Sequence, residues 1–415
     1  MARVLFPTLA LFGLLQLLPV SAGAQAFLIP KSFDRATIPF EYINGFIVVT
    51  MTVNDRLPLR FVFDTGAEHT ILLQPEMARM LGMRYTRVFD IRGSDLLSDR
   101  KAYLVRMVDL KCRLNERETL EFPYRSVLVL EEDYFRFESY AGTPIHGILG
   151  ADIFSNFTVR IDFRRREIRL YRPGDFRPGD RFEALPVDIY RNKAYLHATT
   201  GLVAGDSIAV KLLVDSGAAL PLLLYTETSE KLTLPETVIE GMIGSGIGGE
   251  LSGFLGRMEH LRLGTHHLER PVTNFQRLPL LVDTSLLNQR QGILGSRLLE
   301  QFEVVLDYRE EMLYLRRYRQ KQRRRVYDRS GLVVTAGGEG LREFYVHWII
   351  SGSPAAEADL QPGDLLVSVN GTPVGTLGLA GIRAKLRKKA GKRVRLKVWR
   401  DGYLIKTELI LRELI

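Results

Sequence analysis

Residues 61–67 read FVFDTGA, and residues 212–218 read LLVDSGA. Each copy is an apolar run that ends in an aspartate, which is followed by a hydroxyl residue and a glycine. Asp followed by Ser or Thr and then Gly arises by chance on the order of a few tenths of a time in a chain of this length, so one copy alone is weak evidence. The pair predicts that two carboxylates, Asp64 and Asp215, lie face to face, hold one proton between them and activate a water.

Each aspartate is followed by the same companions. Residues 146–150 read HGILG and residues 291–295 read QGILG; further on, residues 160–163 read RIDF and residues 305–308 read VLDY. The two aspartates are 151 residues apart and the last glycines of the two ILG elements are 145 apart, so the second copy has six residues fewer in its middle. This period is far too long for a solenoid and predicts a domain-sized duplication, with one carboxylate in each of two lobes.

At 415 residues the chain is long enough for two or three domains. Its composition, 46% hydrophobic and 25% charged, is typical of a packed protein. No later stretch has 18 consecutive apolar residues, which argues against a transmembrane helix after the N-terminal region. Cys112 is the only cysteine, so no intrachain disulfide can form, and we interpret it as a small buried hydrophobe. The seven histidines show no metal-ligand spacing. We therefore expect neither a metal nor a cofactor.

The N-terminal residues 1–26 have the pattern of a signal peptide. Arg3 precedes an apolar stretch over residues 4–20, and residues 24–26 read AQA, a small-residue cleavage pattern. The alternative is an uncleaved membrane anchor, which is disfavoured because the apolar stretch is short and a cleavage site follows it. The sequence thus predicts an exported protein, either periplasmic or secreted.

The net charge of +9 is concentrated in residues 316–325 and again in residues 383–400. Nucleic acid is the obvious alternative partner, but an exported protein rarely meets nucleic acid. The first cluster also falls where a linker is expected, and the second lies on one helix face and the strand after it. We expect no nucleic-acid binding and favour a solvated face or contact with an anionic surface.

Most of the chain after the signal peptide reads as strands. Residues 46–53 and 59–63 form a hairpin around the turn residues Asn54 and Asp55, and residues 195–199 and 208–214 repeat that arrangement before the second aspartate. A short helix is expected over residues 75–81. The expected divisions are the signal peptide 1–26, an N-terminal lobe 27–172, an interlobe linker 173–184, a C-terminal lobe 185–317, a basic linker 318–328 and a further domain 329–415.

Each lobe also has a candidate mobile hairpin between its aspartate and its ILG element. In the second lobe it is the glycine-rich stretch 241–250, with Gly244, Ser245 and Gly246 at its centre. In the first lobe it is centred near Gly93 and Ser94. Glycines would let such a hairpin tip bend over bound substrate. A phosphate-binding loop is the alternative, but no Lys-Ser or Lys-Thr pair follows.

These motifs carry a family resemblance. Residues 64–72, DTGAEHTIL, resemble the active-site turn of retropepsin-like aspartic proteases, and the ILG elements resemble a later element of the same family. Because both motifs occur twice in the same order, the region from about residue 40 to residue 317 resembles two such lobes fused as in pepsin. The resemblance implies a mainly β fold, the two-lobed pepsin/retropepsin-like acid protease β-barrel.

The resemblance also implies an aspartic endopeptidase, with Asp64 and Asp215 as the catalytic residues and no covalent intermediate. By the same resemblance, Thr65 and Ser216 bond across the lobe interface, while Gly66 and Gly217 allow the two turns to approach closely. The chain departs from retroviral relatives at Asp152, where they have Arg. Arg297 follows the second ILG element, so we expect the two lobes to be braced differently.

Residues 351–371, SGSPAAEADLQPGDLLVSVNG, closely resemble the middle of a bacterial PDZ domain, a small β-sandwich or barrel with helices. The resemblance implies that an extended peptide binds by adding a strand, beside a helix over residues 377–389. Gly331 and Leu332 are the candidates for the carboxylate-binding loop, and Asp359 stands where relatives commonly have Gly. This domain would recruit substrates, locate the protease or act as a structural cap.

The leading hypothesis is an exported single-chain aspartic endopeptidase that acts on protein or peptide substrates. The alternative is a non-catalytic peptide-binding or scaffold protein that reuses the protease fold. Retention of both aspartates and both hydroxyl residues favours the enzyme, because a pure binder gains nothing from burying two carboxylates together.

Overall fold

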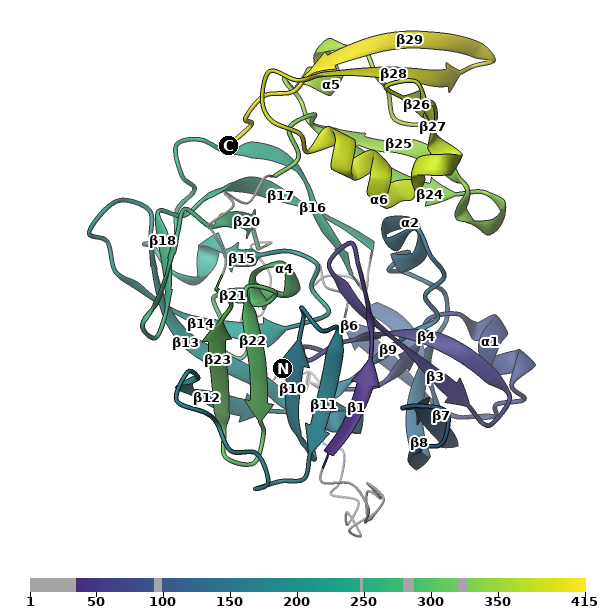
Figure 1. Cartoon of the computed structure of the whole chain (residues 1–415), viewed down its shortest axis with the longest axis vertical. Coiled ribbons are helices and arrows are strands. Elements are labelled where there is room, and N and C mark those ends of the chain that lie inside the picture. Colours follow the sequence, from purple (N-terminus) through teal and green to yellow (C-terminus); the bar gives the residue numbers. More distant parts are fainter. Residues whose placement is uncertain (1–34, 93–98, 247–248, 279–286, 320–326) are drawn as a thin grey trace, which may run out of the picture.

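The computed structural model describes residues 35–92, 99–246, 249–278, 287–319 and 327–415. The predicted signal peptide and the flap candidates Gly93 and Ser94 lie outside the described residues. The fold is built mainly from strands, in an N-terminal lobe, a C-terminal lobe and a smaller C-terminal domain (Figure 1).

The N-terminal lobe is an eight-stranded sheet with the order β2-β3-β4-β9-β5-β8-β7-β6. The hairpin of β3 and β4 turns at Asn54 and Asp55, which both take the left-handed conformation, with φ of 51° and 55°. Helix α1 ends at Met80, one residue before the predicted end. The elements are β2 (Glu41–Ile43), β3 (Phe46–Val53), β4 (Leu57–Phe63), β5 (Ile71–Leu72), α1 (Pro75–Met80), β6 (Tyr85–Arg92), β7 (Asp99–Arg113), β8 (Thr119–Leu130), α2 (Phe137–Ala141), β9 (Gly147–Leu149) and α3 (Ala151–Phe154).

The C-terminal lobe repeats this plan. Strand β14 pairs in parallel with β21, as β4 pairs in parallel with β9. The elements are β13 (Lys193–Gly201), β14 (Ile208–Asp215), β15 (Leu222–Tyr225), η1 (Thr226–Thr228), β16 (Ile239–Gly246), β17 (Gly249–Arg257), β18 (His260–Leu263), β19 (His266–Glu269), β20 (Val272–Gln276), β21 (Gly292–Gly295) and α4 (Ser296–Leu299).

Six strands join the two lobes. They run in the order β1-β11-β10-β22-β23-β12 and are continuous with the C-terminal lobe in one fifteen-stranded sheet. Strand β10 of the first copy pairs with β22 of the second, and residues 172–182, which overlap the expected linker 173–184, connect β11 to β12. These strands are β1 (Arg35–Pro39), β10 (Thr158–Asp162), β11 (Glu167–Tyr171), β12 (Glu183–Tyr190), β22 (Phe302–Asp307) and β23 (Met312–Arg317).

The C-terminal domain has a six-stranded sheet of its own, with β24 at one edge, and a separate hydrophobic core. Helix α6 begins and ends three residues earlier than predicted, and Gly378, with φ of 61°, interrupts it near its start. Asp359 takes the left-handed conformation with φ of 52°. The elements are β24 (Leu332–Gly337), η3 (Glu339–Leu341), β25 (Glu343–Ile349), α5 (Pro354–Glu357), β26 (Leu365–Val369), β27 (Thr372–Pro373), α6 (Val374–Leu386), β28 (Arg393–Arg400) and β29 (Tyr403–Ile410).

Cys112 lies in the core of the N-terminal lobe, as the sequence indicated, and burial raises the pKa of its thiol to about 12. Among the described residues, no helix has both the length and the apolar character needed to cross a membrane.

Candidate active site

Each predicted catalytic aspartate is delivered by the central strand of its lobe. Asp64 follows β4 directly, and its amide donates to the Leu149 carbonyl at 3.1 Å; Asp215 ends β14 opposite Gly295 of β21. The glycine of each ILG element lies where the loop after the aspartate passes closely. A Cβ on Gly150 would come within 2.4 Å of the His69 carbonyl group, and one on Gly295 within 2.1 Å of the Leu220 carbonyl oxygen. This close passage explains the repeated glycine.

The two carboxyl groups face each other across the lobe interface. Asp64 Oδ1 accepts from the amides of Gly66 at 2.7 Å and Ala67 at 3.0 Å. Asp215 Oδ1 accepts in the same way from Gly217 at 2.8 Å and Ala218 at 2.9 Å. The turn of each aspartate lies against the carboxyl of the other, and each carboxyl affects the pKa of its neighbour.

Only glycine fits at the two positions after the hydroxyl residues. A Cβ on Gly66 would lie 2.5 Å from Asp215 Cγ, and a Cβ on Gly217 would lie 2.2 Å from Asp64 Cγ. Any side chain there would therefore push the two carboxyls apart.

Thr65 and Ser216 form a reciprocal set of hydrogen bonds beneath the aspartates. The Thr65 amide donates to Ser216 Oγ at 3.1 Å, and the Ser216 amide donates to Thr65 Oγ1 at 3.0 Å. Each hydroxyl then donates to a carbonyl of the opposite lobe, Thr65 to Val214 at 2.8 Å and Ser216 to Phe63 at 2.7 Å. Both side chains are fully buried, so the register of the two lobes depends on these bonds.

The environments of the two carboxyls differ. Burial raises the pKa of Asp64 well above its usual range, and the neighbouring charge of Asp215 raises it further. Burial also raises the pKa of Asp215. Two backbone amides lower the pKa of each carboxyl, those of Gly66 and Ala67 for Asp64 and those of Gly217 and Ala218 for Asp215, and the charge of Arg290 further lowers the pKa of Asp215. These differences favour the shared proton on Asp64 and the negative charge on Asp215.

Two cationic residues near Asp215 were missed by the sequence analysis. Arg290 and Lys193 both interact electrostatically with Asp215, and Arg290 Nη2 lies 3.5 Å from the Tyr225 hydroxyl. By strand register, their equivalents in the first copy are Ile145 and Phe46, which belong to one apolar cluster. The sequence signal for both cations is that each replaces an apolar residue of the first copy.

The two lobes are braced by different bonds. Arg297 donates to the Asn44 carbonyl of the opposite lobe at 2.5 Å and to the Ala219 carbonyl at 2.8 Å. Asp152 instead accepts from Thr70 Oγ1 at 2.8 Å within its own lobe. Because Arg297 links the lobes and Asp152 does not, the brace is asymmetric.

The flap candidates of the second lobe lie at the end of the β16–β17 hairpin. Gly244, Ser245 and Gly246 pair with β17, and Ser245 Oγ donates to the Phe135 carbonyl of the N-terminal lobe at 3.1 Å. The corresponding first-lobe hairpin is formed by β6 and β7. The second hairpin therefore spans from one lobe to the other.

Gly331 and Leu332 lie directly before and at the start of β24, with Gly331 at φ of 75°. The Gly331 amide donates to Asp328 Oδ1 at 2.9 Å, and the Leu332 amide donates to Ser330 Oγ at 3.1 Å. In this structure, both amides therefore donate to side chains of the protein itself.

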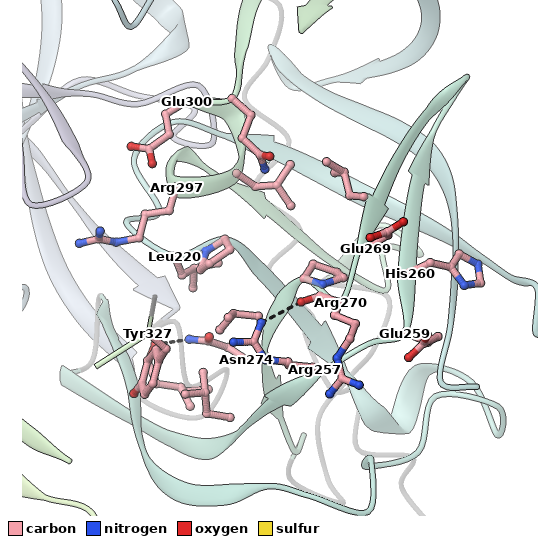
Figure 2. Close-up of a pocket in the computed structure, with 18 of the residues that line it drawn as sticks. Leu220, Arg257, Glu259, His260, Glu269, Arg270, Asn274, Arg297, Glu300 and Tyr327 are labelled. Atoms are coloured by element: carbon pink, nitrogen blue, oxygen red, sulfur yellow. Dashed lines mark hydrogen bonds between the residues drawn. The ribbon is translucent and has the colours of Figure 1, made fainter. Parts of the chain in front are cut away.

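A cavity of about 1260 Å³ lies between the C-terminal lobe and the C-terminal domain. Figure 2 shows Arg257, Arg297 and Tyr327 around it, and Val333 of β24 and Arg383 of α6 complete the side formed by the C-terminal domain. Asp64 and Asp215 do not line this cavity, so it is separate from the paired carboxyls. The described residues contain no group of three or more His, Cys, Asp or Glu side chains that could hold a metal ion.

Comparison with known proteins gives two family matches. Residues 49–153 and 200–298 match the aspartyl protease family, and residues 345–400 match the PDZ domain family. Basic 7S globulin from soybean, known from a crystal structure, is similar over 68% of this chain and 95% of its own, with a TM-score of 0.40 and 9% identity. Asp64 and Asp215 each fall inside one of the two aspartyl protease matches.

Proposed function

Because the chain belongs to the aspartyl protease family, with one retropepsin-like lobe in each half and a PDZ domain after them, we propose that it is an exported aspartic endopeptidase. It hydrolyses peptide bonds with a water held between Asp64 and Asp215. The single observation that carries this proposal is the pair of facing carboxyls, fixed by backbone amides and by the Thr65–Ser216 bonds.

The chemistry follows from the different protonation of the two carboxyls. Ionised Asp215 takes a proton from the water as its oxygen attacks the scissile carbonyl carbon, while protonated Asp64 donates a hydrogen bond to the developing oxyanion. Collapse of the tetrahedral intermediate breaks the C–N bond, and a proton from the carboxyl pair passes to the leaving amine. One carboxyl ends protonated and the other ionised, so the pair is ready for the next water.

The substrate in this proposal is an extended protein or peptide segment that pairs its backbone with the β16–β17 hairpin. The PDZ domain supplies a second peptide site, which recruits substrates or partners to the protease. Neither role requires a cofactor, since carboxyls and water carry out all of the chemistry.

Export is supported by the sequence of residues 1–26 alone. Expression with these residues followed by cell fractionation and N-terminal sequencing tests it. Cleavage after Ala26 and recovery outside the cytoplasm are expected. An uncleaved N-terminus in the membrane fraction would show that residues 1–26 are a membrane anchor and not a signal peptide.

Cleavage of a mixed peptide library between pH 3 and pH 8 tests the catalytic proposal, with the wild type compared with Asp64→Asn and Asp215→Asn. Both variants keep the shape of the carboxyl but cannot transfer its proton, so each should lose nearly all activity. Equal cleavage by all three proteins would exclude the two aspartates as the catalytic pair. A wild type that binds the library without cleaving it would favour the scaffold hypothesis instead.

A further inference from the structure

The short helix α2 of the N-terminal lobe lies at the peptide groove of the PDZ domain. This groove is bounded by the edge strand β24 and by α6, and Figure 1 shows α2 directly beside both elements. Edge strands offer unpaired backbone groups, which an added peptide strand would use. The helix therefore lies where a bound peptide would run.

One arginine links both walls of the groove to α2. Arg383 of α6 donates to the Val334 carbonyl of β24 at 2.8 Å and to the Tyr140 carbonyl of α2 at 2.9 Å. Just after the helix, Gly142 lies against Leu379, since a Cβ on Gly142 would be only 3.0 Å from Leu379 Cβ. These contacts fix α2 to the PDZ domain.

The contact with α2 divides the groove into two parts. At one end, Val333, Val334 and Arg383 line the large cavity described above. At the other end, a smaller hollow of about 470 Å³ is lined by Gly142, Leu379 and neighbouring residues. An extended peptide advances about 3.3 Å per residue, so one that follows the whole edge of β24 must cross the position of α2.

The same helix also holds the flap hairpin. The Tyr140 hydroxyl lies 3.1 Å from Glu250 of β17 and 3.5 Å from Met242 Sδ of β16. His347 of β25 lies 2.5 Å from the same Glu250 carboxylate. With the Ser245–Phe135 bond, the hairpin is thus tied to the segment 135–142 and to the PDZ domain at once.

We propose that α2 occupies the PDZ groove in the resting protein, and that an extended peptide pairing with β24 displaces it and thereby releases the β16–β17 hairpin. The partner is a peptide long enough to span the groove, and its binding opens access to the paired aspartates. The regulatory part rests on the proposed peptidase function, whereas the displacement of α2 does not. The peptide can bind only when α2 has left the groove, because both need the same edge of β24. Peptide binding therefore favours the state in which α2 is displaced.

A disulfide between Gly142→Cys and Leu379→Cys tests the displacement. The two Cβ positions are 3.0 Å apart, so they must separate by a few tenths of an ångström to reach the disulfide range of about 3.5–4.5 Å, and the native Cys112 is buried and does not interfere. The reduced form of the same variant is the matched control for the cost of the substitutions, including the left-handed conformation at position 142. Both forms carry Asp215→Asn, so that the added peptide is not consumed.

Hydrogen exchange is measured over Phe137–Ala141 and over β16 and β17, with and without an equimolar library of ten-residue peptides. The library should speed exchange in both segments of the reduced form and leave the oxidised form unchanged. Peptide-induced acceleration in both forms, or in neither, overturns the proposal. This readout does not depend on hydrolysis, so it is independent of whether the protein is a peptidase.

Tyr140→Phe tests the link to the hairpin without disturbing the groove, because the Arg383 bond uses the Tyr140 backbone. Exchange of β16 and β17 should rise about fivefold, the effect expected from one lost hydrogen bond. Tyr124→Phe removes the hydroxyl of an exposed tyrosine and is the control. Equal exchange in both variants would show that the hairpin is not held through α2. If the aspartate variants confirm hydrolysis, the oxidised disulfide form with Asp215 restored should cleave peptides more slowly than its reduced form.

Discussion

Replacing Thr65 with valine tests whether the bonds beneath the aspartates hold the active site together. Valine has the shape of threonine but lacks the hydroxyl, which accepts from the Ser216 amide and donates to the Val214 carbonyl. Both groups are buried and would lose their partner. At about 1–3 kcal/mol for each unsatisfied group, the variant should lose about 2–6 kcal/mol of unfolding free energy.

Thr65→Ser is the matched control, because it keeps the hydroxyl and removes only a methyl group, worth about 1 kcal/mol. Unfolding is followed by circular dichroism in urea. Trp348 and Trp399, the only two tryptophans, both lie in the PDZ domain. Because Trp348 also lies against Gly241 of the C-terminal lobe, Trp399 is read alone, in a Trp348→Phe background. Its fluorescence reports unfolding of the PDZ domain, which Thr65→Val should leave unchanged.

The same variant should also lose turnover, because the two carboxyls are no longer fixed in register. A misplacement of about 1 Å typically costs about 100-fold in rate, so we expect kcat to fall by roughly that factor while KM changes little. The assay is hydrolysis of a fluorogenic peptide selected from the library. If Thr65→Val and Thr65→Ser match in both stability and kcat, the reasoning about the reciprocal bonds is wrong.

Three further predictions concern charge. Asp64→Asn should stabilise the protein at neutral pH. Folding raises the pKa of Asp64, so the stability that its carboxyl contributes at low pH is lost as the pH rises through the folded-state pKa, about 1.4 kcal/mol for each pH unit between the unfolded and folded pKa. Urea unfolding of both proteins at pH 3 and pH 8 measures this difference. Arg290→Leu should raise the pKa of Asp215 and move the acidic limb of the kcat/KM profile to higher pH, whereas Arg290→Lys should not. Changing the exposed Arg393, Arg395 and Lys397 to glutamine should abolish any salt-sensitive cosedimentation with phosphatidylglycerol vesicles. A wild type that does not sediment with them would exclude the anionic-surface hypothesis.

The features that repeat in the sequence were predictable. The aspartates, the hydroxyl residues and the glycines recur because the same close approach is needed in both lobes, so two copies of the motif carried the information. The mainly β, two-lobed fold and the PDZ domain followed from the same motifs and their resemblance, and the family matches confirm them.

The features that differ between the copies were not predictable in this way. Arg290 and Lys193 stand where the first copy has Ile145 and Phe46. A search for repeated motifs detects only the residues that both copies have in common. Helix α2 has five residues, too few for a helical period to be read. Its contact with Arg383 joins residues 243 positions apart, and only tertiary structure brings them together.

The pairing of β10 with β22 makes the two halves of the chain behave as a tethered heterodimer. Backbone hydrogen bonds, the Arg297 brace and a core that spans both halves would hold them together after a cut between β11 and β12. The covalent connection mainly supplies a high effective concentration of one half for the other. Because that connection spares each half from pairing with an identical copy, one half can keep Ile145 beside its aspartate while the other acquires Arg290. Joining two lobes in one chain thus allows the surroundings of the two aspartates to differ.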